Sequence, residues 1–471
     1  MYKRIFTAGA ALLPLLAGAQ DRAQRPDIVF LFADDWGFPF ARDYGDQNVD
    51  SYLFDRIADE GMVFTNAYCT APSSSPSRAS ILTGRYPHNL RQAANLWGIF
   101  PPDLICYPAR LQESGYVSAY QGKGWEPGLW LLEKGNPAGK QVKDLAAWIR
   151  STPADQPICA WFGSHRPHRP YVEGSGVEHG FSTSAVLVSE NLPDVEEVRG
   201  DMADYYWNIR LFQDECMDVM RALEETGRLE NTLLVIAGDN GYPFPRAKSN
   251  VYDEGCHVPL AIRWPGVTKP KSRCEGFVSL MDLTATFYEA SGVTPPDSLQ
   301  SVSLIPTLLG KADGRPEIFT EKERHVPRRD GTGYPSRSLR DKKFQYIRNF
   351  HPERTSQGED PIYGEVDNGP AKKYMVEHAR ETHPELYDLA FGPRPAEELY
   401  DVVNDPWLKH NLASDPAYRK VLRKMSRKMD RWMKESYDPR YRNPGYVATD
   451  RYRYMNNRRV LEQAINTDNW E

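Results

Sequence analysis

Two largely apolar runs, at residues 27–32 and 232–237, constrain the fold of this chain more than any other feature. Both consist mainly of β-branched, aromatic and other large apolar residues, a composition that is typical of strands buried on both faces. Helical patterns lie between the runs, for example at 51–60 and 203–225. Strands and helices that alternate in this way predict an α/β fold with a central, mostly parallel sheet.

The character of the sequence changes near residue 335. Residues 343–350 alternate like a strand with one face in water, and residues 418–437 form a strongly charged helical pattern. We therefore expect a smaller C-terminal α+β domain with an antiparallel sheet, whose tail after Asp438 is an extended surface segment. The predicted organisation is a signal peptide at 1–19, a catalytic domain at 20–335, and the C-terminal domain with its tail at 336–471.

The first residues read as an export signal. Lys3 and Arg4 precede an apolar stretch at 5–16, and Ala17-Gly18-Ala19 is typical of a cleavage site. The apolar stretch is too short to span a bilayer. We therefore expect an exported protein that does not span the membrane. The expected location is the bacterial periplasm, and the alternative is secretion from the cell.

Neither the charge nor the cysteine content indicates a nucleic-acid or zinc protein. The formal net charge is −6, with both signs mixed along the chain, so we expect no nucleic-acid surface. The six cysteines include no Cys-x-x-Cys pair, which argues against zinc. Export permits disulfides, but many pairings of six cysteines are possible and the sequence selects none.

An acidic or amide pair follows each of the two apolar runs. Asp34 and Asp35 come after the first run, and Asp239 and Asn240 come after the second. Ligands in such sheets bind at the carboxyl ends of the strands. An all-oxygen set of side chains suits calcium rather than zinc or copper. One acidic pair after a strand is commonly a solvated turn, so the metal hypothesis depends on two pairs that meet.

The segment Ser74–Arg85 predicts a short helix that presents a serine at its N-terminal end. Pro76 suits the first turn and Gly84 suits the position just after the helix, so Ser74 lies at the N-terminal end with Arg78 one turn further in. The free N–H groups of such an end favour an anion beside the serine. The segment also matches the sulfatase signature of Cys or Ser, any residue, Pro, Ser, Arg, three residues, then Leu-Thr-Gly-Arg.

Beyond this motif, the chain resembles the type I, formylglycine-dependent sulfatases, and within them most closely the heparan N-sulfatase (N-sulfoglucosamine sulfohydrolase) branch. The branch is suggested by residues 238–245, 277–284 and 334–338. The resemblance implies an alkaline-phosphatase-like fold and a formylglycine derived from Ser74. It also implies a calcium ion held by Asp34, Asp35, Asp239, Asn240 and the modified Ser74.

Three basic residues complete the expected site. Lys123 lies in a Gly-Lys-Gly segment, His168 lies between two prolines, and Lys248 follows Asn240 by eight residues. Each alone reads as a surface or loop residue, but together they supply the cations and the proton donor that sulfate ester cleavage needs. The resemblance implies that these three hold sulfate or serve the leaving group, and that Arg78 holds the formylglycine hydrate.

The sequence departs from the family pattern at two places. Serine rather than cysteine at position 74 implies maturation by an anaerobic radical-type sulfatase-maturating enzyme. The histidine that many members carry shortly after the lysine is replaced by Trp125 and Glu126. We expect Trp125 to stack on a sugar and Glu126 to accept hydrogen bonds from it, the alternative being that both only shape a loop. The candidates to replace the missing histidine are His165, His257 and His325.

The leading hypothesis is therefore an exported sulfatase that acts on a sulfated sugar or glycan. N-sulfoglucosamine or another glycosaminoglycan-type terminal sugar is the expected substrate, and cleavage of an N–S or an O–S bond stays open. The nearest alternative is a phosphatase or phosphonate monoester hydrolase of the alkaline phosphatase superfamily that uses Ser74 unmodified. A non-catalytic glycan-binding protein with the same fold is the third possibility.

Overall fold

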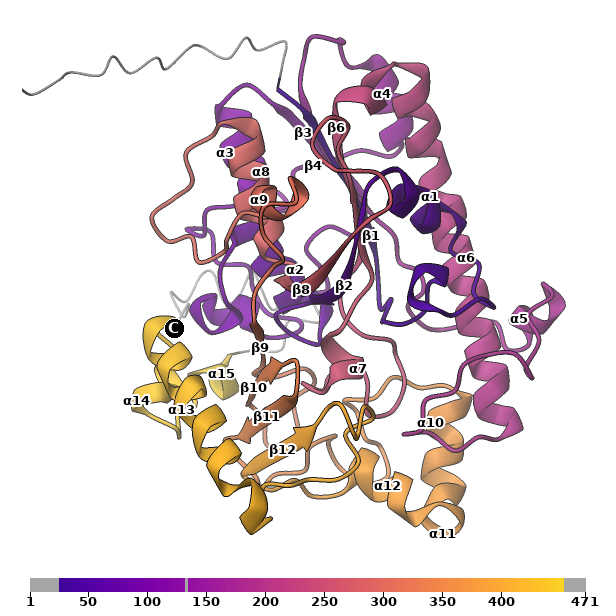
Figure 1. Ribbon diagram of the computed structural model, residues 1–471, viewed down its shortest axis with the longest axis vertical. Helices are drawn as coiled ribbons and strands as arrows, with labels where there is room; N and C mark the ends of the chain where they lie inside the picture. The colour runs from indigo at the N-terminus through magenta and orange to yellow at the C-terminus, as the bar shows by residue number, and fades with distance from the viewer. Residues whose placement is uncertain (1–24, 132–133, 453–471) are drawn as a thin grey trace, which may run out of the picture.

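The structure is a computed structural model that describes residues 25–131 and 134–452 (Figure 1). The predicted signal peptide at 1–19 lies outside these residues. The six cysteines are all described, and each is buried and free, so none of the possible disulfides is formed. Among the described residues, no helix has the length and apolar character that crossing a membrane requires.

A mixed, mostly parallel sheet of eight strands forms the centre of the larger domain. The two apolar runs are its central strands β1 and β6, which pair in parallel from Asp27↔Thr232 to Ala33↔Gly238. Strand β7 runs antiparallel to both of its neighbours. In the order β4-β3-β5-β1-β6-β7-β2-β8, the strands are Lys140–Gln141, Val117–Gly122, Ile158–Gly163, Asp27–Ala33, Thr232–Gly238, Leu260–Arg263, Met62–Tyr68 and Ser272–Ser279.

Helices cover both faces of this sheet, as the α/β prediction requires (Figure 1). Alternate residues of β1 enter different cores: Phe30 and Phe32 pack on one face, whereas Val29 and Leu31 pack on the other. Both faces are therefore dry, which explains why the run is continuously apolar. The first face is covered by α2 (Ser74–Thr83), α3 (Tyr107–Glu113) and α8 (Asp282–Ser291), and the second by α1 (Tyr52–Glu60), α4 (Leu145–Ser151) and α6 (Glu196–Glu225).

The second sheet is antiparallel, with the order β12-β11-β10-β9. Helix α13 (Arg419–Glu435) packs on it through Met425, Met429 and Met433. The sequence analysis began the C-terminal domain at residue 336, but the first strand of this sheet, β9, lies before that residue. Its strands are β9 (Glu317–Lys322), β10 (Ser336–Asp341), β11 (Phe344–Asn349) and β12 (Glu397–Asp401).

The remaining helices are short. The sequence analysis expected the tail after Asp438 to be extended. The described part of this tail instead contains two short helices. The reason is Arg440, which is fully buried and pairs with Glu323. The short helices are α5 (Ser175–Glu178), α7 (Asp253–Cys256), α9 (Ile305–Leu308), α10 (Pro370–Tyr374), α11 (Arg380–Thr382), α12 (Pro384–Phe391), α14 (Pro439–Arg442) and α15 (Ala448–Arg451).

Candidate active site

The two acidic pairs meet at the carboxyl end of the central sheet. Because β1 and β6 are parallel neighbours in register, Asp34 and Asp35 end beside Asp239 and Asn240. All four side chains are buried, and the three carboxylates each offer an oxygen within 4.8 Å of the others. The backbone N–H of Asp35 donates to Asp239 Oδ1 at 2.9 Å, and Asn240 Nδ2 donates to Asp35 Oδ1 at 2.8 Å.

Helix α2 delivers Ser74 to this cluster. The serine begins the helix, and its Oγ donates to Asp34 Oδ1 at 2.9 Å, with Asn240 Oδ1 at 3.2 Å. One turn of the helix is fixed by Ser77 Oγ, which donates to the carbonyl of Asp239 at 2.6 Å. Gly84 ends the helix at φ +67, a left-handed conformation that favours glycine. The local signals for this helix thus place the serine against the carboxylates.

Arg78 holds α2 to the cluster and leaves its Nη2 group without a hydrogen bond to the described residues. Its Nε donates to Asp239 Oδ2 at 2.8 Å, and its Nη1 donates to the carbonyl of Lys123 at 2.9 Å. Its Nη2 is buried without a hydrogen-bond acceptor in the part of the chain that the structure describes. A buried donor without an acceptor is costly, so Nη2 is available to an oxygen atom bound at Ser74.

Two lysines extend the cluster. Lys123 Nζ lies 2.6 Å from Asp34 Oδ2, and Lys248 Nζ lies 2.7 Å from both Asp35 Oδ2 and Asp367 Oδ2. Burial alone would raise the pKa of Asp34, but the charges of Lys123 and the other nearby cations outweigh it and hold that pKa well below its usual value. Burial opposes the charge of Lys248, yet its two carboxylate partners raise its pKa, so it stays protonated.

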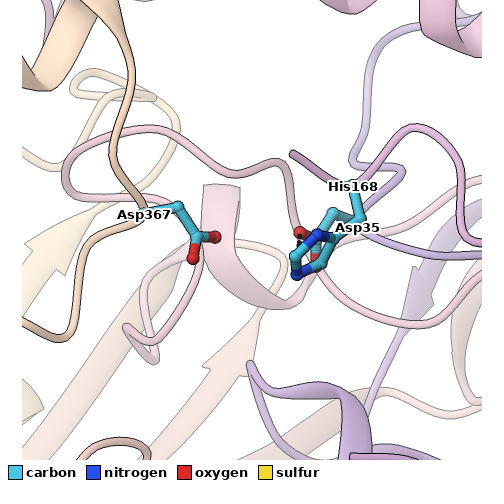
Figure 2. Close-up of side chains that lie close together, drawn as sticks. All are labelled: Asp35, His168 and Asp367. Atoms are coloured by element: carbon cyan, nitrogen blue, oxygen red, sulfur yellow. Dashed lines mark ion pairs between the residues drawn. The ribbon is translucent and has the colours of Figure 1, made fainter. Parts of the chain in front are cut away.

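His168 and Asp367 approach the cluster from two sides (Figure 2). His168 Nε2 lies 3.7 Å from Asp35 Oδ2, and its side chain is 34% exposed, the most open of the group. Its Nδ1 lies 2.5 Å from the carbonyl oxygen of Arg169, which places the Nδ1 proton on that bond and leaves Nε2 facing the site.

Asp367 is the residue that the sequence analysis missed. It lies in the loop just before α10, and Lys248 and His168 lower its pKa although burial acts in the opposite direction. No pattern marks this aspartate, because it follows Val366 in a polar, turn-rich segment that belongs to no strand. Only the chain's return from the second sheet brings it to the first.

The donor set fits a hard divalent cation such as calcium. Burial raises the pKa of Asp239, although the charge of Arg78 acts in the opposite direction. When Asp367 is included, four carboxylates face the three permanent cations Arg78, Lys123 and Lys248 in a largely buried site. Calcium binds oxygen ligands that carry surplus negative charge. A bound cation would lower the pKa of Asp239 and so keep this carboxylate ionised.

The structure corrects the expectation for Trp125. Its ring is fully buried, packs against Phe100 with the ring centroids 5.1 Å apart, and donates its indole N–H to the carbonyl of Ser75 at 2.9 Å. A ring without an exposed face cannot stack on a sugar, so the alternative interpretation, that it shapes the loop, applies. Glu126 beside it is partly exposed, and its pKa is raised by burial against the effect of Lys123.

The three candidate histidines occupy different places. His165 is exposed and lines the same hollow as His168. His325 is buried with its Nδ1 2.8 Å from Ser73 Oγ, and burial lowers its pKa to about 4, which keeps it neutral at pH 7. His257 stacks on Phe38 with ring centroids 3.8 Å apart and belongs to the core, away from the site.

Comparison with known proteins identifies the family. The sequence matches the description "Sulfatase" over residues 26–135 and 140–293. The chain belongs to the sulfatase family. A second match, "N-sulphoglucosamine sulphohydrolase, C-terminal", covers residues 244–353 of this sulfatase. Family membership supports a sulfate ester hydrolase and agrees with the resemblance noted from the sequence.

Relatives of this sulfatase act on sulfated glycans. It is 29% identical to an ulvan-active sulfatase of Formosa agariphila, covering 88% of this chain and 81% of the relative. It is 26% identical to human N-sulphoglucosamine sulphohydrolase, covering 89% of this chain and 92% of the relative.

Solved structures support the fold. A protein in complex with its substrate D-glucosamine-2-N,6-O-disulfate has a TM-score of 0.65 at 19% identity, over 88% of this chain and 99% of that one. A phosphonate monoester hydrolase from Silicibacter pomeroyi has a TM-score of 0.66 at 18% identity, over 92% and 100%. The alkaline-phosphatase-like fold predicted from the sequence is confirmed, but the fold alone does not separate sulfatase from phosphonate hydrolase.

Proposed function

We propose that this sulfatase is an exported enzyme that removes sulfate from a sulfated sugar through a formylglycine made from Ser74. The observation that carries the proposal is the position of Ser74 Oγ, at the start of α2 and 2.9 Å from a carboxylate of a buried, all-oxygen cluster. A formylglycine at this position would, as its hydrate, provide the hydroxyl for attack on sulfur. Asp34, Asp35, Asp239, Asn240 and residue 74 would hold calcium, which would supply positive charge beside the sulfate.

The other residues have roles that follow from their contacts. Arg78 Nη2 has no hydrogen-bond acceptor among the described residues and lies 3.8 Å from Asp34 Oδ1, the atom that Ser74 Oγ contacts, so it is available to the hydroxyl at position 74. Lys123 and Lys248 place their ammonium groups around the sulfate oxygens, where they stabilise the charge that develops as the bond breaks. His168, the most exposed of the group, would act as the imidazolium: it keeps its Nδ1 proton on the Arg169 carbonyl and donates the Nε2 proton to the leaving group.

The proposed substrate is a glycosaminoglycan-type sugar, with N-sulfoglucosamine as the first candidate. This choice is supported by the C-terminal family match and by the human relative. The ulvan-active relatives and the complex with a doubly sulfated glucosamine support sulfated sugars more generally. Glu126 and His165, both solvent-accessible near Lys123 and His168, are the residues proposed to contact the sugar.

The test compares Ser74→Ala with Ser80→Ala. Ser80 lies on the same helix, is also buried, and its Oγ has no hydrogen-bond partner among the described residues, so it controls for loss of a buried hydroxyl. Both variants are made with an anaerobic radical-type maturating enzyme and assayed on defined sulfated mono- and disaccharides. We expect Ser74→Ala to lose turnover and Ser80→Ala to keep it, and mass spectrometry to show loss of two hydrogens at Ser74.

The same assay separates the alternatives. The phosphonate monoester hydrolase alternative stays open because the fold is equally similar to such an enzyme. On this alternative, the protein with an unmodified Ser74 would be active on a phosphonate ester. Comparable sulfatase activity in Ser74→Ala would overturn the proposed mechanism. Binding of sulfated sugars without any turnover by matured protein would support the non-catalytic protein instead.

A further inference from the structure

The outer face of α13 carries a regular array of positive charge. Arginines recur at every fourth position, and lysines recur beside them with the same spacing. Residues four apart on a helix are neighbours, about 5–6 Å apart at Cβ. At 1.5 Å per residue, the arginines form a row about 18 Å long and the lysines a parallel row about 12 Å long. The rows are Arg419, Arg423, Arg427 and Arg431, and Lys420, Lys424 and Lys428; together we call them the cationic face.

The helix is amphipathic, and the cationic face points away from the protein. Met425 and Met429 point inward onto the second sheet. Six of the seven cations are exposed, and Lys428 is half-buried. In Figure 1, α13 lies at the edge of the molecule, outside the strands β10 and β11.

Six of the seven cations on this face have no carboxylate partner in the described chain. Lys428 pairs with Glu317 and lies 3.9 Å from Asp341, whereas the six exposed cations form no ion pair with any carboxylate that the structure describes. A shallow hollow of about 420 Å³ on this face is lined by cations alone: Lys420, Arg423, Lys424, Arg427, Lys428 and Arg431.

Such an array has a cost that a structural role does not explain. Like charges four residues apart destabilise a helix, and each row repeats that arrangement. The whole chain has a net charge of −6, so the positive face is a local concentration rather than a general excess. Two rows of cations complement a linear polymer with regularly repeated anions.

We propose that the cationic face binds the sulfated polysaccharide on which the enzyme acts, at a place separate from the active site. The choice of this polyanion rests on the proposed function. Guanidinium groups bind oxyanions in a bidentate manner, which suits a row of arginines to sulfate groups. Binding here raises the concentration of sulfated chain ends around the enzyme without contributing to the chemical step.

The test removes three charges from the face and three from elsewhere. Arg423→Gln/Arg427→Gln/Arg431→Gln keeps good helix formers on α13. The matched control, Lys140→Gln/Lys269→Gln/Lys311→Gln, changes the net charge equally at exposed residues away from α13. Affinity is measured for dextran sulfate, neutral dextran, duplex DNA and phosphatidylserine vesicles, together with activity on a sulfated monosaccharide.

We expect the α13 variant to bind dextran sulfate at least about tenfold more weakly. The control should bind within twofold of the unmodified protein, and monosaccharide activity should be unchanged in both. Equal loss in the control, undiminished binding in the α13 variant, or binding of DNA or vesicles as tight as that of dextran sulfate would each overturn the proposal. Binding needs no modified Ser74, so an inactive enzyme that still binds through α13 would contradict only the proposed function.

Discussion

Two clusters of buried charge in this protein differ in how completely their polar groups are satisfied. The active-site cluster lies at the end of the first sheet and contains Asp34, Asp35, Asp239, Arg78, Lys123 and Lys248. The second, which we call the docking cluster, joins the two domains and contains His88, Glu321, Glu323, Arg337, Asp438 and Arg440. In both, the charged groups are almost entirely removed from water, so their difference lies in pairing.

In the docking cluster each charge has a close partner. Arg337 Nε lies 2.6 Å from Asp438 Oδ2 and its Nη2 lies 2.7 Å from Glu323 Oε1, while Arg440 Nη2 lies 2.6 Å from Glu323 Oε2. His88 Nδ1 lies 2.6 Å from Glu321 Oε2. Although His88, Glu321 and Asp438 could together hold a metal ion, the guanidinium of Arg337 already pairs with both of their carboxylates.

The active-site cluster also contains close ion pairs, but its groups are not all satisfied. Burial raises the pKa of Asp239 although Arg78 Nε lies 2.8 Å from its Oδ2, and Arg78 Nη2 has no hydrogen-bond acceptor among the described residues. In the docking cluster the opposite holds, because Arg440 and Arg337 lower the pKa of Glu323 against the effect of burial. A cluster whose polar groups are all satisfied secures an interface, whereas a buried donor without an acceptor indicates a place where a ligand completes the set.

The largest predicted effect is on the docking cluster. Arg337→Met leaves buried carboxylates without a cation, so the free energy of unfolding should fall by about 3–5 kcal/mol. Urea unfolding measures the change, and Arg329→Met at an exposed arginine is the control, with an expected change of at most about 0.5 kcal/mol. A loss below about 1 kcal/mol in Arg337→Met would show that the matched pairs do not secure the interface.

The second prediction concerns the carboxylates of the active-site cluster. Asp239→Asn removes the charged partner of the buried Arg78 but keeps an amide oxygen in its place, so the metal-free protein should lose about 1–3 kcal/mol of stability. Calcium should no longer raise the melting temperature, and kcat/KM should fall at least about a hundredfold, roughly 2.7 kcal/mol. Asp297→Asn, at an exposed aspartate, is the control. Calcium stabilisation that survives in Asp239→Asn would refute the metal assignment.

The smallest predicted effect tests the link between the two domains. Asp367→Asn leaves Lys248 with Asp35 as its only carboxylate partner among the described residues and weakens the anchor of the loop before α10. We expect kcat/KM to fall about tenfold, roughly 1.4 kcal/mol, mainly through KM, with little change in melting temperature. Asp360→Asn, which alters an exposed ion pair with Arg380 in the same segment, should leave kinetics unchanged. Unaltered kinetics in Asp367→Asn would remove that residue from the site.

What the sequence predicted well depends on local signals. The strands β1 and β6 and the helix that starts at Ser74 each follow from a short run of residues. The convergence of Asp34 with Asp239 followed because neighbouring parallel strands end at the same edge. These parts needed no knowledge of distant contacts.

What the sequence did not predict depends on distant contacts. The burial of Trp125 is decided by Ser75 and Phe100, which no local pattern connects to it. Residues 385–388 and 398–401 share the sequence Glu-Leu-Tyr-Asp, yet the first segment lies in a helix and the second in a strand, because only the second has β11 beside it. Asp367 escaped detection for the same reason: its partner Lys248 lies far back in the sequence.

The burial of Ser74 has a consequence for the order of events during synthesis. Its partner Asn240, and Lys248 and Asp367 around the same cluster, are all made later than the serine itself. The groups that seal the interface between the domains come later still, at Asp438 and Arg440. Ser74 therefore cannot be covered by Asn240 until Asn240 has been made, and that interval would give the proposed maturating enzyme access to the serine.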